Sequence, residues 1–122
     1  MIDDDVLSFL RTSIRSVWTL ELLLLLWRAQ DRAWSAAELV RELRASDSIV
    51  FDGIAALQAA GLVVSEGKDG FRYKPASSVL DLLLQRLAQL YRERPMVVTR
   101  ALFASPEQKL QTFADAFRLK KD

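Results

Sequence analysis

The sequence feature that most constrains the fold is a change of apolar spacing at Gly61. Before it, Val50, Ile54 and Leu57 follow one another at i, i+4 and i+7, the spacing of one face of a helix. After it, two β-rich runs flank the turn sequence Gly-Lys-Asp-Gly. We predict that a helix ends at Gly61 with a left-handed cap and that a small hairpin follows.

Two short helices are predicted ahead of this hairpin. Ser35 and Glu38 have the spacing of a capping box, in which each side chain accepts a hydrogen bond from the other residue's backbone amide. A helix is therefore expected over residues 36–43. The second helix begins at Ser46 or Ser48, so the pair forms a helix-turn-helix.

The N-terminal part predicts a buried helix at the centre of the fold. From Ile14 to about Ala29 apolar residues recur at helical spacing, and additional leucines widen the buried face. Aspartates at positions 3–5 precede a further apolar stretch, and negative charge is favoured at a helix start. We expect a short leading helix there, either separate from the central helix or continuous with it.

Three amphipathic helices are predicted after the hairpin. Ser78 and Asp81 have capping-box spacing, and the helix behind them continues until Pro95 stops or kinks it. A shorter helix is expected in MVVTRALFA. Ser105 with Pro106 opens the last helix. Its apolar stripe consists of Leu110, Phe113, Ala114 and Phe117.

Length and composition indicate one globular domain over residues 1–122. The chain of 122 residues suits a single core, and 51% hydrophobic with 27% charged residues is an ordinary globular composition. We expect a mainly α fold with a small β-hairpin. Because the sequence has no cysteine and no histidine, disulfides, thiolate or imidazole metal sites and histidine-activated nucleophiles are excluded.

The apolar stretch from Val17 to Trp27 is not expected to cross a membrane. It has eleven residues and includes Glu21, whereas a span needs about twenty apolar residues. It also lacks the cleavage site of a secretory signal. We therefore expect a cytoplasmic protein.

Charge is distributed unevenly although the net charge is +1. Residues 1–66 carry six basic and ten acidic side chains, and residues 67–122 carry eleven and six. An anionic partner is therefore expected to prefer the second half.

Residues 14–76 resemble the DNA-binding part of small bacterial winged-helix regulators, such as the MarR and PadR groups. The resemblance is carried by the segment ALQAAGLVVSEGKDGFRYKP. Its features, in order, are a leucine, a pair of small residues, the sequence Gly-Leu-Val, a polar turn and a strand that contains aromatic residues. It implies a winged helix-turn-helix core over 14–76. The resemblance does not extend to residues 77–122, which are expected to be a helical extension for dimerisation or partner binding.

The resemblance implies a regulator that binds DNA as a dimer, with particular residues facing the duplex. The polar residues expected nearest the bases are Ser46, Ser48 and Asp52. The cations expected on phosphates are Arg41, Arg44, Lys68, Arg72 and Lys74. The chain departs from the usual chemistry of a reading helix, because no basic residue lies between Arg44 and Lys68. Asp47, Asp52 and Glu66 would instead repel phosphates.

An alternative interpretation is a winged-helix module that holds another regulatory protein and does not bind DNA. Ile49 and Phe51 beside Asp47 and Asp52 resemble an apolar anchor with a charged rim, as at protein interfaces. The structural alternative is that Phe51 packs under the leading helix.

The C-terminal helices carry more apolar surface than one small core needs. Part is expected to pack on the central helix, and the rest is expected to pair two copies in a homodimer, with a compact monomer as the alternative. The interface candidates in this region are Leu84, Leu87, Tyr91, Phe103, Phe113 and Phe117.

Catalysis is not expected. No nucleophile elbow, phosphate loop or metal-ligand spacing occurs, and the four glycines suit helix packing, a cap and a turn. We therefore expect no enzyme activity, no cofactor and no metal.

Overall fold

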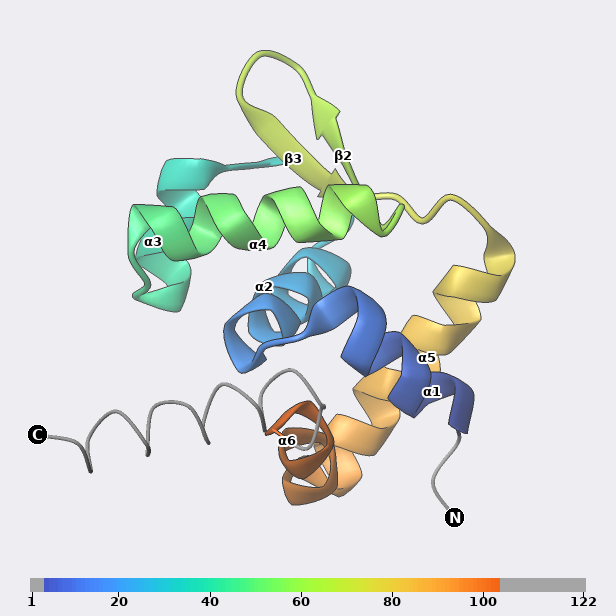
Figure 1. Ribbon diagram of the computed structural model, residues 1–122. Coiled ribbons are helices and arrows are strands. Elements are labelled where there is room, and N and C mark those ends of the chain that lie inside the picture. Colours follow the sequence, from blue (N-terminus) through green and yellow to red (C-terminus); the bar gives the residue numbers. More distant parts are fainter. Residues whose placement is uncertain (1–3, 104–122) are drawn as a thin grey trace, which may run out of the picture.

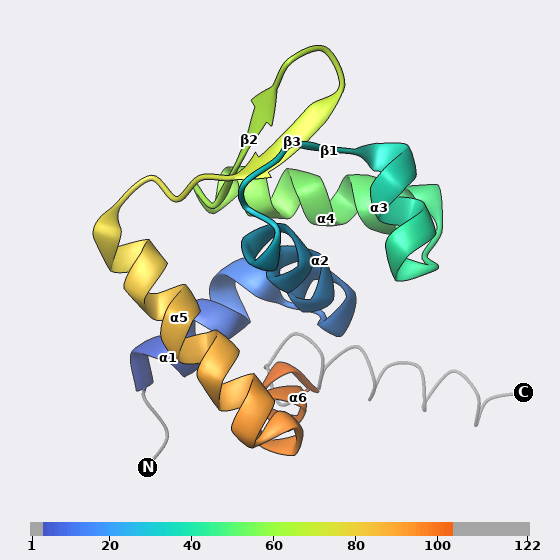
Figure 2. The same cartoon turned by 180° about the vertical axis from the view of Figure 1, so that it is seen from behind.

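The computed structural model describes residues 4–103, which Figures 1 and 2 show from opposite sides. Its helical elements are α1 (Asp4–Phe9), the π-helical turn η1 (Leu10–Ile14), α2 (Val17–Arg28), α3 (Ala36–Leu43), α4 (Asp47–Ala59), α5 (Ser78–Glu93) and α6 (Pro95–Phe103). Its strands are β1 (Trp34–Ser35), β2 (Val63–Glu66) and β3 (Gly70–Tyr73). The expected mainly helical fold with a small antiparallel hairpin is confirmed at this level. The helix predicted from Ser105 lies outside the described residues.

The leading helix is separate from α2. Arg15 adopts the left-handed conformation with φ of 71°, and its backbone N–H donates to the carbonyl oxygen of Leu10 at 2.8 Å. Ser16 then caps α2, its hydroxyl accepting from the backbone N–H of Thr19 at 3.1 Å. A positive φ ends the helical hydrogen-bond pattern, so the chain changes direction here.

Helix α4 begins and ends as predicted. Ser46, the first of the two predicted caps, accepts from the backbone N–H of Ile49 at 3.2 Å and starts α4. At the other end Gly61 has φ of 78°, and the N–H of Leu62 donates to the carbonyl oxygen of Leu57 at 3.0 Å. This is the predicted left-handed cap.

The sheet has a third strand that the sequence pattern did not predict. β1 pairs with β3 on the side opposite β2, with Trp34 opposite Phe71. Two residues are too few to show a strand period. Gly70 is required at this junction, because a Cβ there would lie 2.5 Å from the carbonyl oxygen of Glu66 and 3.0 Å from Cβ of Ala33.

The core is built around α2, as predicted. In both views α4 lies on one side of α2 and α6 on the other (Figures 1 and 2). One cluster of buried side chains includes leucines of α2 such as Leu22 and Leu26, Leu57 of α4 and Val98 of α6. The helices after the hairpin thus share a core with the elements before it.

Two of the predicted interface residues belong to this core. Leu84 and Leu87 of α5 have no exposed surface, so the prediction that they meet a partner is wrong. Their side of α5 faces the chain's own helices. Phe103 is 60% exposed and remains available. Phe113 and Phe117 lie outside the described residues.

The predicted capping box at the start of α5 is also wrong. The cap is Ser77, whose hydroxyl accepts from the backbone N–H of Leu80 at 3.2 Å. Asp81 points elsewhere, and its carboxylate accepts from the hydroxyl of Tyr73 at 2.7 Å. A tertiary partner has therefore replaced the local one. α5 ends before Pro95, which is the first residue of α6.

Candidate nucleic-acid interface

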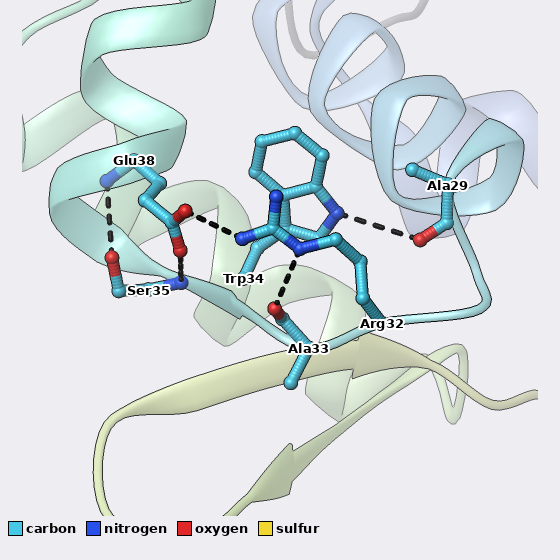
Figure 3. A network of polar contacts seen from close by, with 6 residues as sticks. All are labelled: Ala29, Arg32, Ala33, Trp34, Ser35 and Glu38. Carbon is cyan, nitrogen blue, oxygen red and sulfur yellow. Dashed lines mark hydrogen bonds and ion pairs between the residues drawn. The ribbon is translucent and has the colours of Figure 1, made fainter.

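A polar network holds the start of α3 beside the sheet (Figure 3). The predicted capping box is present: the N–H of Glu38 donates to Ser35 Oγ at 3.1 Å, and the N–H of Ser35 donates to Glu38 Oε1 at 3.0 Å. The guanidinium of Arg32 pairs with Oε2 of the same carboxylate. The Ser35 amide and then Arg32 lower the pKa of Glu38 to about 2. The carboxylate therefore stays ionised and the cap stays formed in all but strong acid.

Trp34 connects this network to α2. The guanidinium carbon of Arg32 lies 4.0 Å from the centre of the indole ring, a cation–π arrangement. The indole N–H donates to the carbonyl oxygen of Ala29 at 3.4 Å (Figure 3). Because Trp34 is also in β1, the end of α2, the sheet and the start of α3 are joined at one place.

The inner face of α4 packs closely on α2. Val50, Ile54 and Leu57 are at most 3% exposed, which confirms the predicted orientation. A Cβ at Gly53 would lie 2.7 Å from Cδ2 of Leu22, so glycine allows the two helices this close approach. The opposite face of α4 is thereby directed outward.

That outer face is acidic and carries an exposed aromatic ring. Phe51 is 55% exposed, so the alternative that it packs under the leading helix is wrong. Asp47 and Asp52 are exposed and form no hydrogen bond or ion pair through their side chains within residues 4–103. Ser48 is exposed beside them, whereas Ile49 is half-buried. We call Asp47, Ser48, Phe51 and Asp52 the α4 outer face.

Two arginines stand at the end of α3, next to the start of α4. Arg41 and Arg44 are both exposed, and neither guanidinium has a partner in the described part of the chain. Arg44 adopts φ of 55° and its backbone N–H donates to the carbonyl oxygen of Val40, which ends α3. Cations are favoured at a helix C-terminus and leave their charge facing solvent here.

The hairpin supplies fewer free cations than predicted. Lys68 in the turn and Lys74 after β3 are exposed. Arg72, however, bonds both carboxylate oxygens of Glu66 at 3.2 Å and donates through Nε to the carbonyl oxygen of Gln30 at 2.9 Å. Its charge is paired and its role is to join the hairpin to the loop after α2. We therefore remove Arg72 from the predicted phosphate contacts.

Two tyrosine–carboxylate contacts that sequence reasoning missed attach α5 to the rest of the fold. Tyr73 donates to Asp81, and Tyr91 donates to Oε1 of Glu21, each at 2.7 Å. Burial and then the adjacent carboxylate raise the pKa of both phenols, that of Tyr91 to about 12. No local pattern signals such contacts, because Tyr91 and Glu21 are 70 residues apart.

Residues 4–103 contain no group of three or more carboxylates that could hold a metal ion. No helix in that range has both the length and the apolar character needed to cross a bilayer. Comparisons with protein-family models, curated proteins and solved structures found no match.

Proposed function

We propose that the chain is a winged-helix regulator that binds DNA through α4 and the elements beside it. The order α2, β1, α3, α4, β2, β3 supports this, since it is the order of a winged helix-turn-helix. The observation that carries the proposal is the α4 outer face, whose four residues are all exposed. Unpaired Arg41 and Arg44 precede it, and Lys68 lies at the hairpin turn.

In this proposal, the residues that provide affinity for DNA and the residues that read its sequence lie on different elements. α4 itself contains no lysine or arginine, so phosphate neutralisation falls to Arg41, Arg44, Lys68 and Lys74. If all four release a counterion, log Kobs falls with log salt with a slope of about −3.6 for one copy. Base edges are left to the α4 outer face, where a serine hydroxyl or an aspartate accepting from cytosine has suitable chemistry. Ser46 is committed to capping α4.

The test is a fluorescence anisotropy titration with a labelled mixed-sequence duplex over a series of salt concentrations. Arg41→Gln and Arg44→Gln should each weaken binding and reduce the salt slope by about 0.9. Arg100→Gln, at an exposed position on α6, is the matched control and should leave the slope unchanged. Absence of binding at low salt, or equal slopes in all variants, would exclude the proposal.

We also propose that two copies pair through apolar side chains of α5 and α6. Val79, Leu82, Met96 and Phe103 are each more than half exposed, which is unusual for a set of large apolar groups on two neighbouring helices. Sedimentation velocity should show a dimer that Leu82→Arg or Phe103→Arg converts to monomer. A monomer at all concentrations in the unsubstituted chain contradicts the pairing.

A second function is favoured by Phe51: a protein-interaction module that holds another regulatory protein with a basic rim around an apolar pocket. A half-exposed phenyl ring between two unpaired aspartates suits such a partner better than a phosphate backbone. Phe51→Arg separates the two functions, because it adds a cation for DNA but removes the anchor for a protein. Ala59→Arg, near the exposed end of α4, is the control. Stronger DNA binding by Phe51→Arg favours DNA, whereas specific loss of a co-purifying protein favours the module.

A further inference from the structure

A hollow of about 630 Å³ lies between the end of α2 and one face of α5. Sites for small molecules commonly have volumes of about 300–1,000 Å³. The α5 residues in its wall, including Asp81, Gln85, Gln89 and Arg92, are spaced so that they lie on one side of the helix. The opposite wall includes Arg28, near the last turn of α2.

Several polar groups of the wall already have partners within the protein. Both oxygens of Asp81 accept, one from Tyr73 and the other from Nε2 of Gln85 at 3.0 Å. The amide nitrogen of Gln89 donates to Glu93 at 3.3 Å. Each amide therefore keeps its oxygen and one N–H for a ligand, and the negative charge of Asp81 is compensated by two donors.

The two arginines of the wall differ from these residues in their hydrogen bonding. Arg28 and Arg92 are exposed, and within residues 4–103 neither guanidinium donates a hydrogen bond or forms an ion pair. Each presents a planar set of five N–H donors that matches a carboxylate or phosphate. The hollow thus offers unused cationic donors from both walls and carbonyl acceptors between them.

We propose that this hollow binds a small organic molecule that carries a carboxylate or phosphate group, held between Arg28 and Arg92. The amide oxygens of Gln85 and Gln89 suit hydroxyl groups on the same molecule. The volume of about 630 Å³ lies within the range of small-molecule sites, so we expect a ligand larger than a simple inorganic anion. A hydroxy acid or a sugar phosphate has this combination of groups.

The position of the hollow connects it to the hairpin. Asp81 belongs to the wall and also accepts from Tyr73 of β3. A ligand that displaces Gln85 from Asp81 would therefore act on the carboxylate that holds the base of the hairpin. An effect of the ligand on DNA affinity rests on the proposed function. Binding of the ligand itself does not.

The test is isothermal titration calorimetry of the full chain with citrate, glucose 6-phosphate and inorganic phosphate. We expect one saturable site for citrate or glucose 6-phosphate, which distinguishes a carboxylate from a phosphate ligand. Arg28→Gln and Arg92→Gln should each weaken that binding by at least about tenfold, the effect of losing a charged hydrogen bond. Arg94→Gln, an exposed arginine at the end of α5 outside the hollow, should bind as the unsubstituted chain does.

The proposal is overturned if none of the three probes binds, or if both arginine variants bind as tightly as the control. Equal affinity for inorganic phosphate and the two larger probes also overturns it, because the rest of the hollow would then contribute nothing. Both substituted arginines are exposed, so thermal unfolding of the variants should match that of the control. A DNA titration with and without the bound probe separates the regulatory effect from ligand binding.

Discussion

In two regions of this protein, aromatic side chains lie close to carboxylates. The two regions differ in whether the aromatic side chain donates a hydrogen bond to the carboxylate. On the α4 outer face, Phe51 lies between Asp47 and Asp52, and all three side chains face solvent without a partner in the described chain. Around α5, two tyrosines donate to two carboxylates and bring together β3, α2 and α5.

The physical difference is the phenolic hydroxyl. Phenylalanine has no donor, so Phe51 offers no hydrogen bond to the carboxylates beside it. Tyrosine supplies a donor, so Asp81 and Glu21 can lie against an aromatic ring that is partly buried. The α5 contacts therefore stabilise the fold, whereas we expect the exposed α4 outer face to add little to folding.

The largest expected effect is on the free energy of unfolding, when the buried ring of Tyr73 is removed and compared with removal of the exposed ring of Phe51. Tyr73 is 4% exposed, so Tyr73→Ala should lower the free energy of unfolding by about 3–5 kcal/mol. Phe51→Ala should change it by no more than about 0.5 kcal/mol, because its ring is exposed. Urea unfolding followed by circular dichroism measures both. Similar losses for the two variants would contradict the comparison.

A smaller effect isolates the hydroxyl groups. Tyr73→Phe and Tyr91→Phe keep the rings and remove one hydrogen bond each, so each should lower the free energy of unfolding by about 1 kcal/mol. The raised pKa of Tyr91 means that the folded state favours the protonated phenol. Its contribution is complete below about pH 10 and is lost as the pH rises towards 12.

Unfolding measured between pH 9 and pH 12 tests this, with Tyr91→Phe as the matched control. The difference in stability between the unsubstituted chain and Tyr91→Phe should shrink as the pH rises. A constant difference would show that the hydroxyl contributes through packing alone.

The next effect concerns the unpaired carboxylates. Asp47→Asn and Asp52→Asn remove charges that repel phosphates, so each should raise affinity for a mixed-sequence duplex by about two- to fivefold at low salt, equivalent to roughly 0.5–1 kcal/mol. Neither should change thermal stability by much, whereas Asp81→Asn should lower it. Anisotropy titrations and melting curves measure the two properties. Unchanged DNA binding in both variants would mean that the α4 outer face does not approach the duplex, which favours the protein-interaction function.

The smallest effect is at Glu38, a surface carboxylate that is fully partnered, in contrast to those of α4. Its pKa is lowered from 4.5 to about 2, so its contribution to stability is present above pH 4.5 and is lost as the pH falls towards 2. Glu38→Gln should lack this acid-dependent loss. Melting temperatures of the two chains between pH 2 and pH 6 should therefore converge at the acid end. Parallel curves would mean that the charge of Glu38 does not stabilise the cap.

The predictions from sequence succeeded where the responsible contacts are local. Ser35 with Glu38 and Ser46 with Ile49 are three residues apart, and the helix-ending geometry at Gly61 involves only the preceding turn. The inner face of α4 was also predicted correctly, because it depends on the spacing of apolar residues within one helix. The orientation of the α4 outer face depends on these features, so this part of the candidate site could be predicted from the sequence.

Predictions failed where the actual contact is made between two elements of the fold. Asp81 was expected to cap α5 and instead accepts from Tyr73, and Arg72 was expected to be free and instead pairs with Glu66 and Gln30. Leu84 was expected at an interface, but α5 folds back and buries it. A single sequence contains no signal for which of these partners meet.

The sequence by itself determined most of the described helices, the caps at Ser35, Ser46 and Gly61, and the side of α4 that turns inward. These features depend on backbone hydrogen bonds and apolar spacing within a few residues. Only the tertiary structure decided that β1 joins the sheet, that Arg72 reaches Gln30 across 42 positions and that Tyr91 reaches Glu21 across 70. It also decided that Arg28 and Arg92 border one hollow. The reason is that such contacts depend on how whole elements pack against one another.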